Sequence, residues 1–412
     1  MYVLAIHVPV FKENTKYFIT TEWKRSLVLL RDSFRGYFGQ FSIVAPYIEI
    51  MQGKEEQNLE PVDELEDIFF TPSFPHSCRA RHYWLKYRKK WIYDVHKELV
   101  KGQIFHGGFA DLYRPMNFDA LRQAFKLKKP TVFARDTDEL LKRKQMIELG
   151  AARNTLESYI YFFLYKKAIQ YCISKADLSL LKGRTLYNRY SSYSSNCKLF
   201  HDTSYLSNEI VPDQLRVDRL KTLQMNRPLR FVYCGRFKER KGLMHSLEIL
   251  HKVKKDGCNI ELDLIGDGMQ LGELKKHVAS LGLEQNVRFL GRVDYNAEIF
   301  RELVKYDALF FTPLAEDTPR MIFDGYAAGL PIIGYDIEYL KERSENEDTA
   351  MLSPLGDIDA FANSLKKLDN NREWFYKASD NAYHAAQKYA ADVWYGKRAK
   401  WTIDMYERKT KR

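Results

Sequence analysis

Short apolar runs alternate with amphipathic stretches along the whole chain. In the first half, the apolar runs predict strands at Tyr2–Val8, Phe41–Ala45, Gln103–His106 and Thr131–Ala134. In the second half, they predict strands at Leu229–Cys234, Ile260–Ile265, Val287–Leu290, Ala308–Phe311 and Pro331–Gly334. Helical patterns, such as those at Thr21–Phe38 and Phe118–Lys126, separate the strands. Because parallel strands need crossovers of this length, the alternation predicts an α/β fold with parallel sheets.

The length of the chain predicts two domains, because 412 residues exceed what one hydrophobic core usually serves. A mostly polar stretch, Ile210–Pro228, precedes a new strand and predicts the joint. We therefore expect two doubly wound, Rossmann-like domains, residues 1–211 and 229–392, with a linker at 212–228. The last helix, at about residues 393–412, has an apolar side and is expected to brace the two domains. Such sheets bind ligands beyond the carboxyl ends of their strands, which predicts a site in the cleft between the domains.

One helical stretch is unusually apolar. It runs from Tyr159 to Tyr165 and is ended by Lys166 and Lys167. A membrane span needs about 20 apolar residues. We therefore expect this stretch to be a core helix, and we expect no segment to cross a membrane.

The composition, with 45% hydrophobic and 29% charged residues, is that of a soluble globular protein. The five cysteines are scattered, with no Cys-x-x-Cys pair and no histidine at zinc spacing. This pattern predicts no disulfide, no zinc site and a cytoplasmic location. The net charge of +11 favours an anionic partner, which could be nucleic acid, an anionic membrane surface or a phosphorylated substrate.

Two glycine turns follow predicted strands of the second half. Gly235 and Arg236 end the first strand, and Lys241 stands just before the next helix. Two cations beside a helix N-terminus suit a diphosphate, although a solvated charged turn would explain the same residues. The second turn, Gly266-Asp-Gly268, exposes backbone amides that suit a phosphate or a sugar hydroxyl; a tight turn that needs positive φ explains it equally well.

The segment from Glu316 to Pro331 has the clearest signals for the start and the end of a helix. Thr318 is predicted to cap a helix whose first residue is Pro319, and Gly329 is predicted to end it. The helix then points its N-terminus into the cleft, with Arg320 as a further ligand-binding candidate. Carboxylates accept hydrogen bonds from paired hydroxyls, so Glu316 and Asp324 are candidates for binding sugar and ribose. Alternatively, they are an ordinary loop acid and a surface residue.

The order of these motifs, together with Val287–Val293 and Ala-Ala-Gly-Leu-Pro, resembles glycosyltransferase family 4. This resemblance implies the GT-B fold and a retaining, metal-independent transfer from a nucleotide-sugar donor. It assigns Arg236 and Lys241 to the donor diphosphate, Glu316 to the transferred sugar and Asp324 to the ribose. It also assigns the backbone near Arg292 and Val293 to the nucleotide base. By the same resemblance, residues 1–211 bind the acceptor and 229–392 the donor.

Three positions depart from the family pattern. Asp324 is one methylene shorter than the usual glutamate, and Asp317-Thr318 replaces the usual Gly-Phe. The usual histidine after the strand Thr131–Ala134 is absent, so Asp136 and His106 are the catalytic candidates of the first domain. A non-catalytic relative that only binds donors is therefore an alternative.

A basic aromatic segment spans residues 79–95. At helical spacing, its Trp84, Tyr87, Trp91 and Val95 share one face. That face could pack in the first domain, rest on an anionic membrane or, with its cations, bind another polyanion.

Together these patterns predict a hexosyltransferase-type enzyme of polysaccharide biosynthesis. We expect a UDP-linked donor, a glycan or lipid-linked acceptor, no cofactor and no metal, and a cytoplasmic location that is peripheral on the inner face of the membrane. A phosphorylase or sugar-nucleotide epimerase of the same fold is the alternative among enzymes. A nucleic-acid-binding protein is the alternative from another class; no recognisable module supports it, and no nucleic-acid partner is expected.

Overall fold

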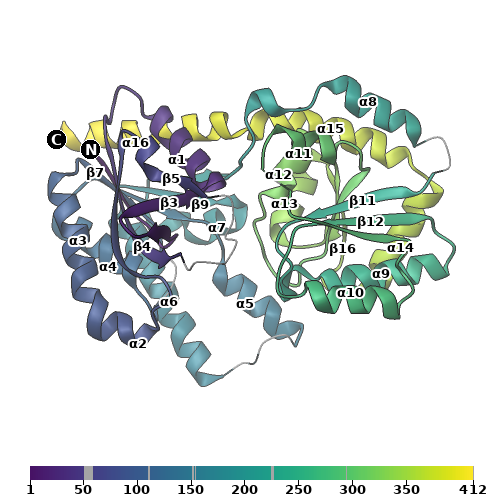
Figure 1. The fold of residues 1–412 in the computed structure, drawn as a ribbon, viewed down its shortest axis with the longest axis horizontal. Coiled ribbons are helices and arrows are strands. Elements are labelled where there is room, and N and C mark those ends of the chain that lie inside the picture. The colour runs from purple at the N-terminus through teal and green to yellow at the C-terminus, as the bar shows by residue number, and fades with distance from the viewer. Residues whose placement is uncertain are drawn as a thin grey trace.

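The computed structural model describes residues 1–50, 59–109, 112–150, 153, 155–223, 227–293 and 295–411. Two α/β domains lie side by side, and the last two helices follow one edge of the molecule, the first along the C-terminal domain and the second along the N-terminal domain (Figure 1). The expected pair of doubly wound domains is confirmed.

The N-terminal sheet has a parallel core. In spatial order its strands are β6 (Ile68–Pro75), β4 (Phe41–Glu49), β1 (Tyr2–Ala5), β7 (Ile104–Gly107), β8 (Thr131–Arg135), β9 (Leu178–Lys182) and β10 (Cys197–Phe200). The sheet is extended by the hairpin β2 (Val10–Glu13) and β3 (Lys16–Thr20) and by β5 (Leu59–Pro61). The sequence pattern located β1, β4, β7 and β8 but not the hairpin.

The C-terminal sheet is parallel throughout its described strands. Their order is β13 (Val287–Gly291), β12 (Ile260–Ile265), β11 (Leu229–Cys234), β14 (Ala308–Phe311), β15 (Ile332–Tyr335) and β16 (Ala350–Ser353). This is the order of a Rossmann sheet, which reverses between β11 and β14. The predicted bounds of β11, β12 and β14 are confirmed.

Helices cover the faces of both sheets. In the N-terminal domain these are α1 (Thr21–Ser33), α2 (Ala80–His82), α3 (Arg88–Lys101), α4 (Met116–Lys126), α5 (Glu139–Glu148), α6 (Leu156–Lys175) and α7 (Gly183–Tyr190). In the C-terminal domain they are α9 (Leu243–Lys255), α10 (Leu271–Ser280), α11 (Ala297–Leu303), α12 (Met321–Ala327), α13 (Glu338–Glu347), α14 (Ile358–Asn370) and α15 (Glu373–Tyr389). Among the residues described, no helix is both long and apolar enough to cross a bilayer.

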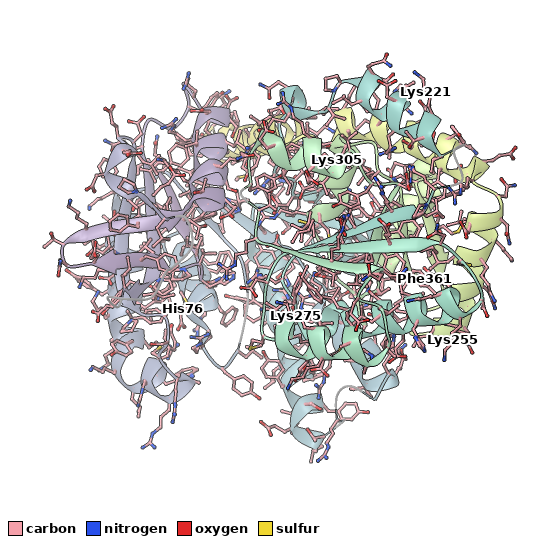
Figure 2. The ribbon with its side chains drawn as sticks, turned by 45° about the vertical axis from the view of Figure 1, so that its right-hand side comes forward. His76, Lys221, Lys255, Lys275, Lys305 and Phe361 are labelled. Atoms are coloured by element: carbon pink, nitrogen blue, oxygen red, sulfur yellow. The ribbon has the colours of Figure 1, made fainter. Side chains whose placement is uncertain are left out.

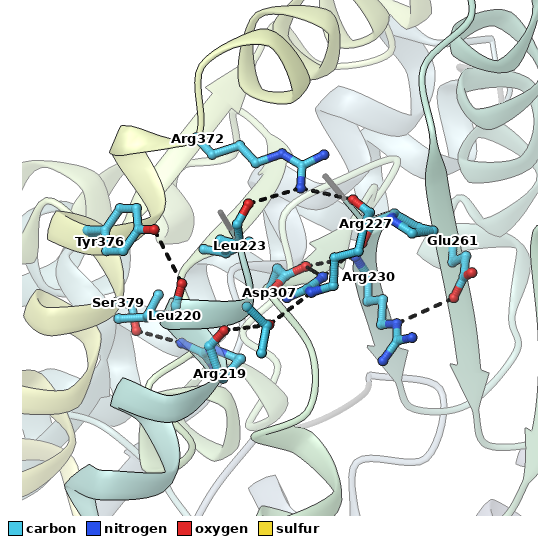
Figure 3. A network of polar contacts seen from close by, with 12 residues as sticks. Arg219, Leu220, Leu223, Arg227, Arg230, Glu261, Asp307, Arg372, Tyr376 and Ser379 are labelled. Atoms are coloured by element: carbon cyan, nitrogen blue, oxygen red, sulfur yellow. Dashed lines mark hydrogen bonds and ion pairs between the residues drawn. The ribbon is translucent and has the colours of Figure 1, made fainter. Parts of the chain in front are cut away.

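The predicted linker, 212–228, contains a helix rather than an extended connection; its residues 224–226 lie outside the described part. This helix, α8 (Asp213–Thr222), packs on the C-terminal domain (Figure 3). Arg219 donates hydrogen bonds to the carbonyl oxygen of Gly329 (3.0 Å) and to the hydroxyl of Ser379 (2.6 Å). Arg227 forms a two-pronged ion pair with buried Asp307 (2.7 and 2.8 Å). The chain therefore joins the C-terminal domain before residue 229.

The last helix, α16 (Ala391–Thr410), braces the two domains as expected. Beyond Ala391 it packs against α1 of the N-terminal domain. Near its end, Lys409 forms an ion pair with Asp177 (2.6 Å), and Tyr406 contacts the ring of Phe38. The helix thus returns the chain to the domain in which it began.

Two predicted helices differ from the structure. The helix expected from Pro319 begins at Met321 as α12, and Thr318 is not its cap. The apolar run Tyr159–Tyr165 is not a core helix, because it belongs to the N-terminal half of α6, where most of its side chains are exposed.

The basic aromatic segment 79–95 forms α2, a π-helical turn (Tyr83–Tyr87) and the start of α3. Trp91 and Val95 are buried, and the Trp91 indole N–H donates to the carbonyl oxygen of Met116 (2.7 Å). Packing in the first domain is therefore the interpretation that the structure supports for this face. Trp84, by contrast, stays half exposed.

Candidate active site

A cleft with a volume of about 1410 Å³ opens between the two domains. Its N-terminal wall includes His7 and His106, at the carboxyl ends of β1 and β7, and its C-terminal wall includes Gly235, Arg236 and Gly266, at the ends of β11 and β12. The strand order reverses between β1 and β7 in one sheet and between β11 and β14 in the other. Because ligands of doubly wound sheets bind at such reversals, both domains point their binding edges into this cleft.

Glycine is required at two turns of the C-terminal domain, one of which, at Gly266, lines the cleft. A Cβ on Gly266 would lie 2.0 Å from the carbonyl oxygen of Gly235, and a Cβ on Gly242 would lie 1.8 Å from that of Thr312. Both glycines also have positive φ, at 135° and 67°. The tight-turn interpretation of Gly266 is therefore correct, and the turn also lines the cleft.

Arg236 is the cation that this wall offers to a ligand. It follows Gly235 directly after β11, its side chain is exposed, and it lines the cleft. Within the described residues, its guanidinium forms no hydrogen bond or ion pair. An uncompensated guanidinium beside a glycine turn suits the paired oxygens of a phosphate.

Lys241 does not line the cleft as the sequence suggested. Its buried ammonium contacts the carboxylate of Asp317 and lies 5.4 Å from the ring centre of Phe311. Arg240 pairs with the same carboxylate at 3.0 Å. Burial would raise the pKa of Asp317, but Lys241 and Arg240 hold it below its usual value. Asp317 therefore supplies a negative charge where the family resemblance expected a glycine.

Glu316 lies one residue earlier and is also buried away from the cleft lining. Its two carboxylate oxygens accept hydrogen bonds from the backbone amides of Glu338 (3.0 Å) and Tyr339 (3.1 Å), at the start of α13. Burial raises the pKa of Glu316 to about 8, although these amides act in the opposite direction. In this arrangement Glu316 positions the loop, and a direct contact with the sugar has no geometric support.

Asp324 sits in α12 as predicted, but it is buried rather than open to the cleft. Tyr295 lines the cleft and donates a hydrogen bond to the Asp324 carboxylate at 2.6 Å. Burial raises the pKa of Asp324 to about 6, while Tyr295 and Arg320 act to lower it. The hydroxyl of Tyr295 therefore stands between the acid and the space available to a ligand.

The segment before α12 is held by the N-terminal domain. The Thr318 hydroxyl donates to the carbonyl oxygen of Asp136 (3.2 Å), and the Thr318 carbonyl accepts from Lys182 (3.2 Å). Arg320 lines the cleft and reaches the hydroxyl of Ser204 at 3.1 Å. These contacts keep Thr318 and Pro319 out of the helix, which explains why the capping prediction was wrong. Neither residue lines the cleft.

The predicted base-binding residues, Arg292 and Val293, are exposed and line the cleft. Arg292 lies 3.4 Å from the carboxylate of Asp267. Tyr295 follows on the same connection between β13 and α11. The connection therefore places candidate base and ribose contacts next to each other.

The N-terminal wall holds both predicted catalytic candidates. Asp136 follows β8 and is exposed in the cleft. His106 is buried, its Nδ1 lies 2.8 Å from the hydroxyl of Tyr2, and burial together with nearby Arg398 lowers its pKa to about 3. His106 is therefore a neutral imidazole at physiological pH.

Within the described residues, no group of three or more histidine, cysteine, aspartate and glutamate side chains is arranged to hold a metal ion. The acids that line the cleft include Asp136 and Asp202, and Asp202 lies 3.9 Å from Arg398.

Comparison with known proteins identifies the C-terminal domain. Residues 218–389 match the family model described as "Glycosyl transferases group 1". Over its whole length the chain also resembles a crystal structure of HepE from Anabaena in complex with UDP and glucose, with a TM-score of 0.65 and 14% identity over 98% of this chain and 99% of that one. The C-terminal domain therefore matches the group 1 glycosyltransferase family, and the chain as a whole has the GT-B fold.

Two curated relatives align with part of this chain. AmsK, an amylovoran biosynthesis glycosyltransferase of Erwinia amylovora, is 29% identical over 150 residues, which are 35% of this chain and 37% of AmsK. The uncharacterized glycosyltransferase MJ1059 of Methanocaldococcus jannaschii is 25% identical over 203 residues, or 46% of this chain and 47% of that one. The aligned stretches thus cover less than half of either relative.

Sequence reasoning missed several residues that line the cleft. His7 stands two residues after the end of β1, so the rule that ligands bind beyond strand ends could have found it. Burial lowers the pKa of His7, although nearby Asp136 acts to raise it. Arg398 and Tyr395 come from α16, and Arg398 lies 3.9 Å from Asp202. No local pattern announces these two, because only the return of α16 to the first domain brings them here.

Proposed function

We propose that this glycosyltransferase transfers a hexose from a UDP-linked donor to a glycan or a lipid-linked acceptor, with retention of the anomeric configuration. The observation that carries the proposal is the unpaired Arg236 at the carboxyl end of β11, beside glycine turns and facing a large interdomain cleft. The UDP and glucose held by HepE support the choice of donor, and the role of AmsK in amylovoran biosynthesis supports a glycan product.

The chemistry follows from the charges. Breaking the anomeric bond places negative charge on the leaving diphosphate, and Arg236 would stabilise it in a site partly shielded from water. Lys241 would add a second charge once its pairing with Asp317 is exchanged for a phosphate. We propose that this cation pair takes the role for which other transferases use a divalent metal.

We propose that the acceptor occupies the N-terminal wall. His7 and Asp136 line it, and each carries atoms able to accept a proton or hydrogen bond from an acceptor hydroxyl. We propose front-side attack by that hydroxyl, as in the family that the motifs resemble. The open wall favours transfer over the donor-only binding of a non-catalytic relative.

The nucleic-acid alternative has less support. Exposed lysines lie on several sides of the C-terminal domain rather than along one groove, as Figure 2 shows for Lys221, Lys255, Lys275 and Lys305. A nucleic-acid interface concentrates its cations on one face.

The donor proposal is tested by nucleotide binding. UDP is expected to raise the melting temperature more than GDP or ADP, because saturation at 100 times the dissociation constant adds about 2.7 kcal/mol. Arg236→Ala is expected to weaken UDP binding roughly 30-fold, the equivalent of about 2 kcal/mol for a lost charged hydrogen bond. Calorimetric titration measures both effects.

Arg230→Ala is the matched control, because Arg230 lies at the other end of β11 and pairs with Glu261 at 3.6 Å. It should leave UDP binding unchanged. An equal response to all three nucleotides, or normal UDP binding by Arg236→Ala, would count against the proposed donor site.

We further propose that Tyr295 and Asp324 together recognise the ribose, with the tyrosine hydroxyl making up the reach that the shorter acid lacks. Tyr295→Phe is then expected to weaken UDP binding by about fivefold, the value of one hydrogen bond, and to leave pyrophosphate binding unchanged. Tyr306→Phe is the control, because Tyr306 donates to buried Asp263 at the same 2.6 Å but does not line the cleft. Equal loss of UDP and pyrophosphate binding would contradict the ribose assignment.

The proposed location is cytoplasmic and peripheral to the inner face of the membrane. Two residues of the face of segment 79–95 that suggested it, Trp91 and Val95, are buried, so a membrane contact needs residues beyond this face.

A further inference from the structure

The exposed half of α6 is the strongest unexplained surface of the molecule. Its exposed apolar side chains recur at the spacing of one helix face: Leu156 (76% exposed), Tyr159 (63%), Ile160 (54%), Phe163 (61%) and Leu164 (52%). The second half of α6 is different, because Tyr165, Ile169, Cys172 and Ile173 are buried in the domain. The helix therefore anchors one end in the core and presents the apolar face of its other end to the surroundings.

The arrangement of the helix makes this face prominent. The N-terminal end of α6 projects beyond the rest of the N-terminal domain (Figure 1). Other aromatic residues flank this face: the ring of Tyr113 stacks on that of Tyr161 of α6 (4.9 Å between ring centres), and the Trp84 indole donates to the Tyr113 carbonyl (2.9 Å). Leu85, next to Trp84, is 76% exposed. We call these residues together with the five of α6 the α6 surface.

Cations surround the α6 surface. Lys166 and Lys167 follow on the same helix, and the Lys167 ammonium lies 5.7 Å from the ring centre of Phe163. On the side of Trp84, the exposed cations are Arg79, Arg81, Lys86, Lys89 and Lys90. Apolar and aromatic side chains inside a basic rim are typical of surfaces that bind anionic bilayers.

We infer that the α6 surface docks the enzyme on an anionic lipid bilayer. A second copy of the chain is the other candidate occupant, but a symmetric pair would bring the same cations together across its interface. The bilayer offers the opposite charge, which attracts each Lys or Arg at the surface. It also removes the apolar side chains from water.

Docking here would orient the proposed reaction. On its buried side, Tyr165 of α6 packs against Phe109, which lines the cleft (5.1 Å between ring centres). The α6 surface and the acceptor wall are thus opposite sides of one packed layer. An acceptor held in the membrane would reach the cleft from this side, a step that rests on the proposed function, whereas docking itself does not.

The test is sedimentation with vesicles of phosphatidylcholine, alone or mixed with phosphatidylglycerol, in the absence of donor and acceptor. The protein is expected to bind only the anionic vesicles, and less at high salt. The double variant Phe163→Asp with Leu164→Asp, and separately Lys166→Glu with Lys167→Glu, should each reduce binding at least about tenfold. Calorimetric titration with UDP shows whether each variant is folded, because the cleft is untouched.

Two controls match these variants. Leu215→Asp changes a leucine that is also exposed on a helix, in α8 on the C-terminal domain, and Lys255→Glu with Lys276→Glu makes the same change of net charge there. Both should bind vesicles as the unchanged protein does. Unaltered vesicle binding by the α6 variants would overturn the inference. So would light scattering that shows a dimer of the unchanged protein and a monomer only for the α6 variants. Failure of the unchanged protein to bind UDP would instead overturn the donor proposal.

Discussion

Replacing Asp317 with asparagine is expected to lower the free energy of unfolding by about 3 kcal/mol and to tighten UDP binding about tenfold. Lys241 is buried, and its described charge partner is Asp317; the other close cation, Arg240, repels it. Removing one member of a buried pair leaves an uncompensated charge, which is the reason for the loss of stability. The same uncompensated lysine should bind a diphosphate that no longer competes with a carboxylate.

The experiment compares chemical denaturation with calorimetric titration of UDP at pH 7. Because the pKa of Asp317 is lowered in the folded protein, its contribution is present above about pH 4 and is lost only as pH falls through the still lower folded value. The control is Asp263→Asn, since Asp263 is a buried acid paired with Arg288 (2.6 Å) outside the cleft. It should cost stability without changing UDP binding. Weaker or unchanged UDP binding by Asp317→Asn would show that Lys241 does not serve the diphosphate.

Glu316 is expected to make the protein less stable as the pH rises from 6 to 8.5. Burial raises its pKa to about 8, so the folded protein keeps a proton that the unfolded chain releases near pH 4.3. The contribution of Glu316 to the free energy of unfolding is therefore fully present below the pKa of the unfolded chain. It falls as the pH rises toward the pKa of the folded protein. At about 1.4 kcal/mol for each pH unit, the loss between pH 6 and 8 is about 2–3 kcal/mol.

Glu316→Gln should remove this dependence, because the amide does not titrate. The free energy of unfolding of the variant and of the unchanged protein is measured in denaturant at pH 6 and 8.5. Relative to the unchanged protein, the variant should be more stable at pH 8.5 than at pH 6. Glu342→Gln is the control: burial would raise the pKa of Glu342, but His201 and Arg343 lower it to about 2, so its effect should be equal at both pH values. Parallel pH profiles for Glu316→Gln and the unchanged protein would mean that Glu316 is ionised when folded.

The backbone architecture followed from the sequence because strands of a parallel sheet are buried on both faces and read as continuous apolar runs. The predicted ends of β11, β12 and β14 are therefore correct. Cleft residues at strand ends, such as Arg236 and Asp136, followed from the same rule.

The errors arose where tertiary contacts outweigh local preference. Thr318-Pro319 has the sequence of a helix start, yet interdomain hydrogen bonds hold it outside α12. The apolar period of α6 shows that the helix has an apolar face, but not whether that face has a partner within the chain. Lys241 is a third case, because its partner Asp317 stands 76 residues away and no spacing connects them.

The return of α16 to the first domain means that the chain crosses between the domains twice, and the two crossings are tied together. The backbone amide of Ala391 donates to the carbonyl oxygen of Tyr205 (2.7 Å), and the amide and hydroxyl of Ser207 donate to Asp392 (2.9 and 2.7 Å). Two adjacent, bonded connections act as a hinge and permit rotation about their common line more readily than sliding. Rotation of the domains apart would therefore move Arg398 with the N-terminal domain, while Arg320 stays with the C-terminal domain. The cleft would widen most at the edge that lies farthest from the two connections.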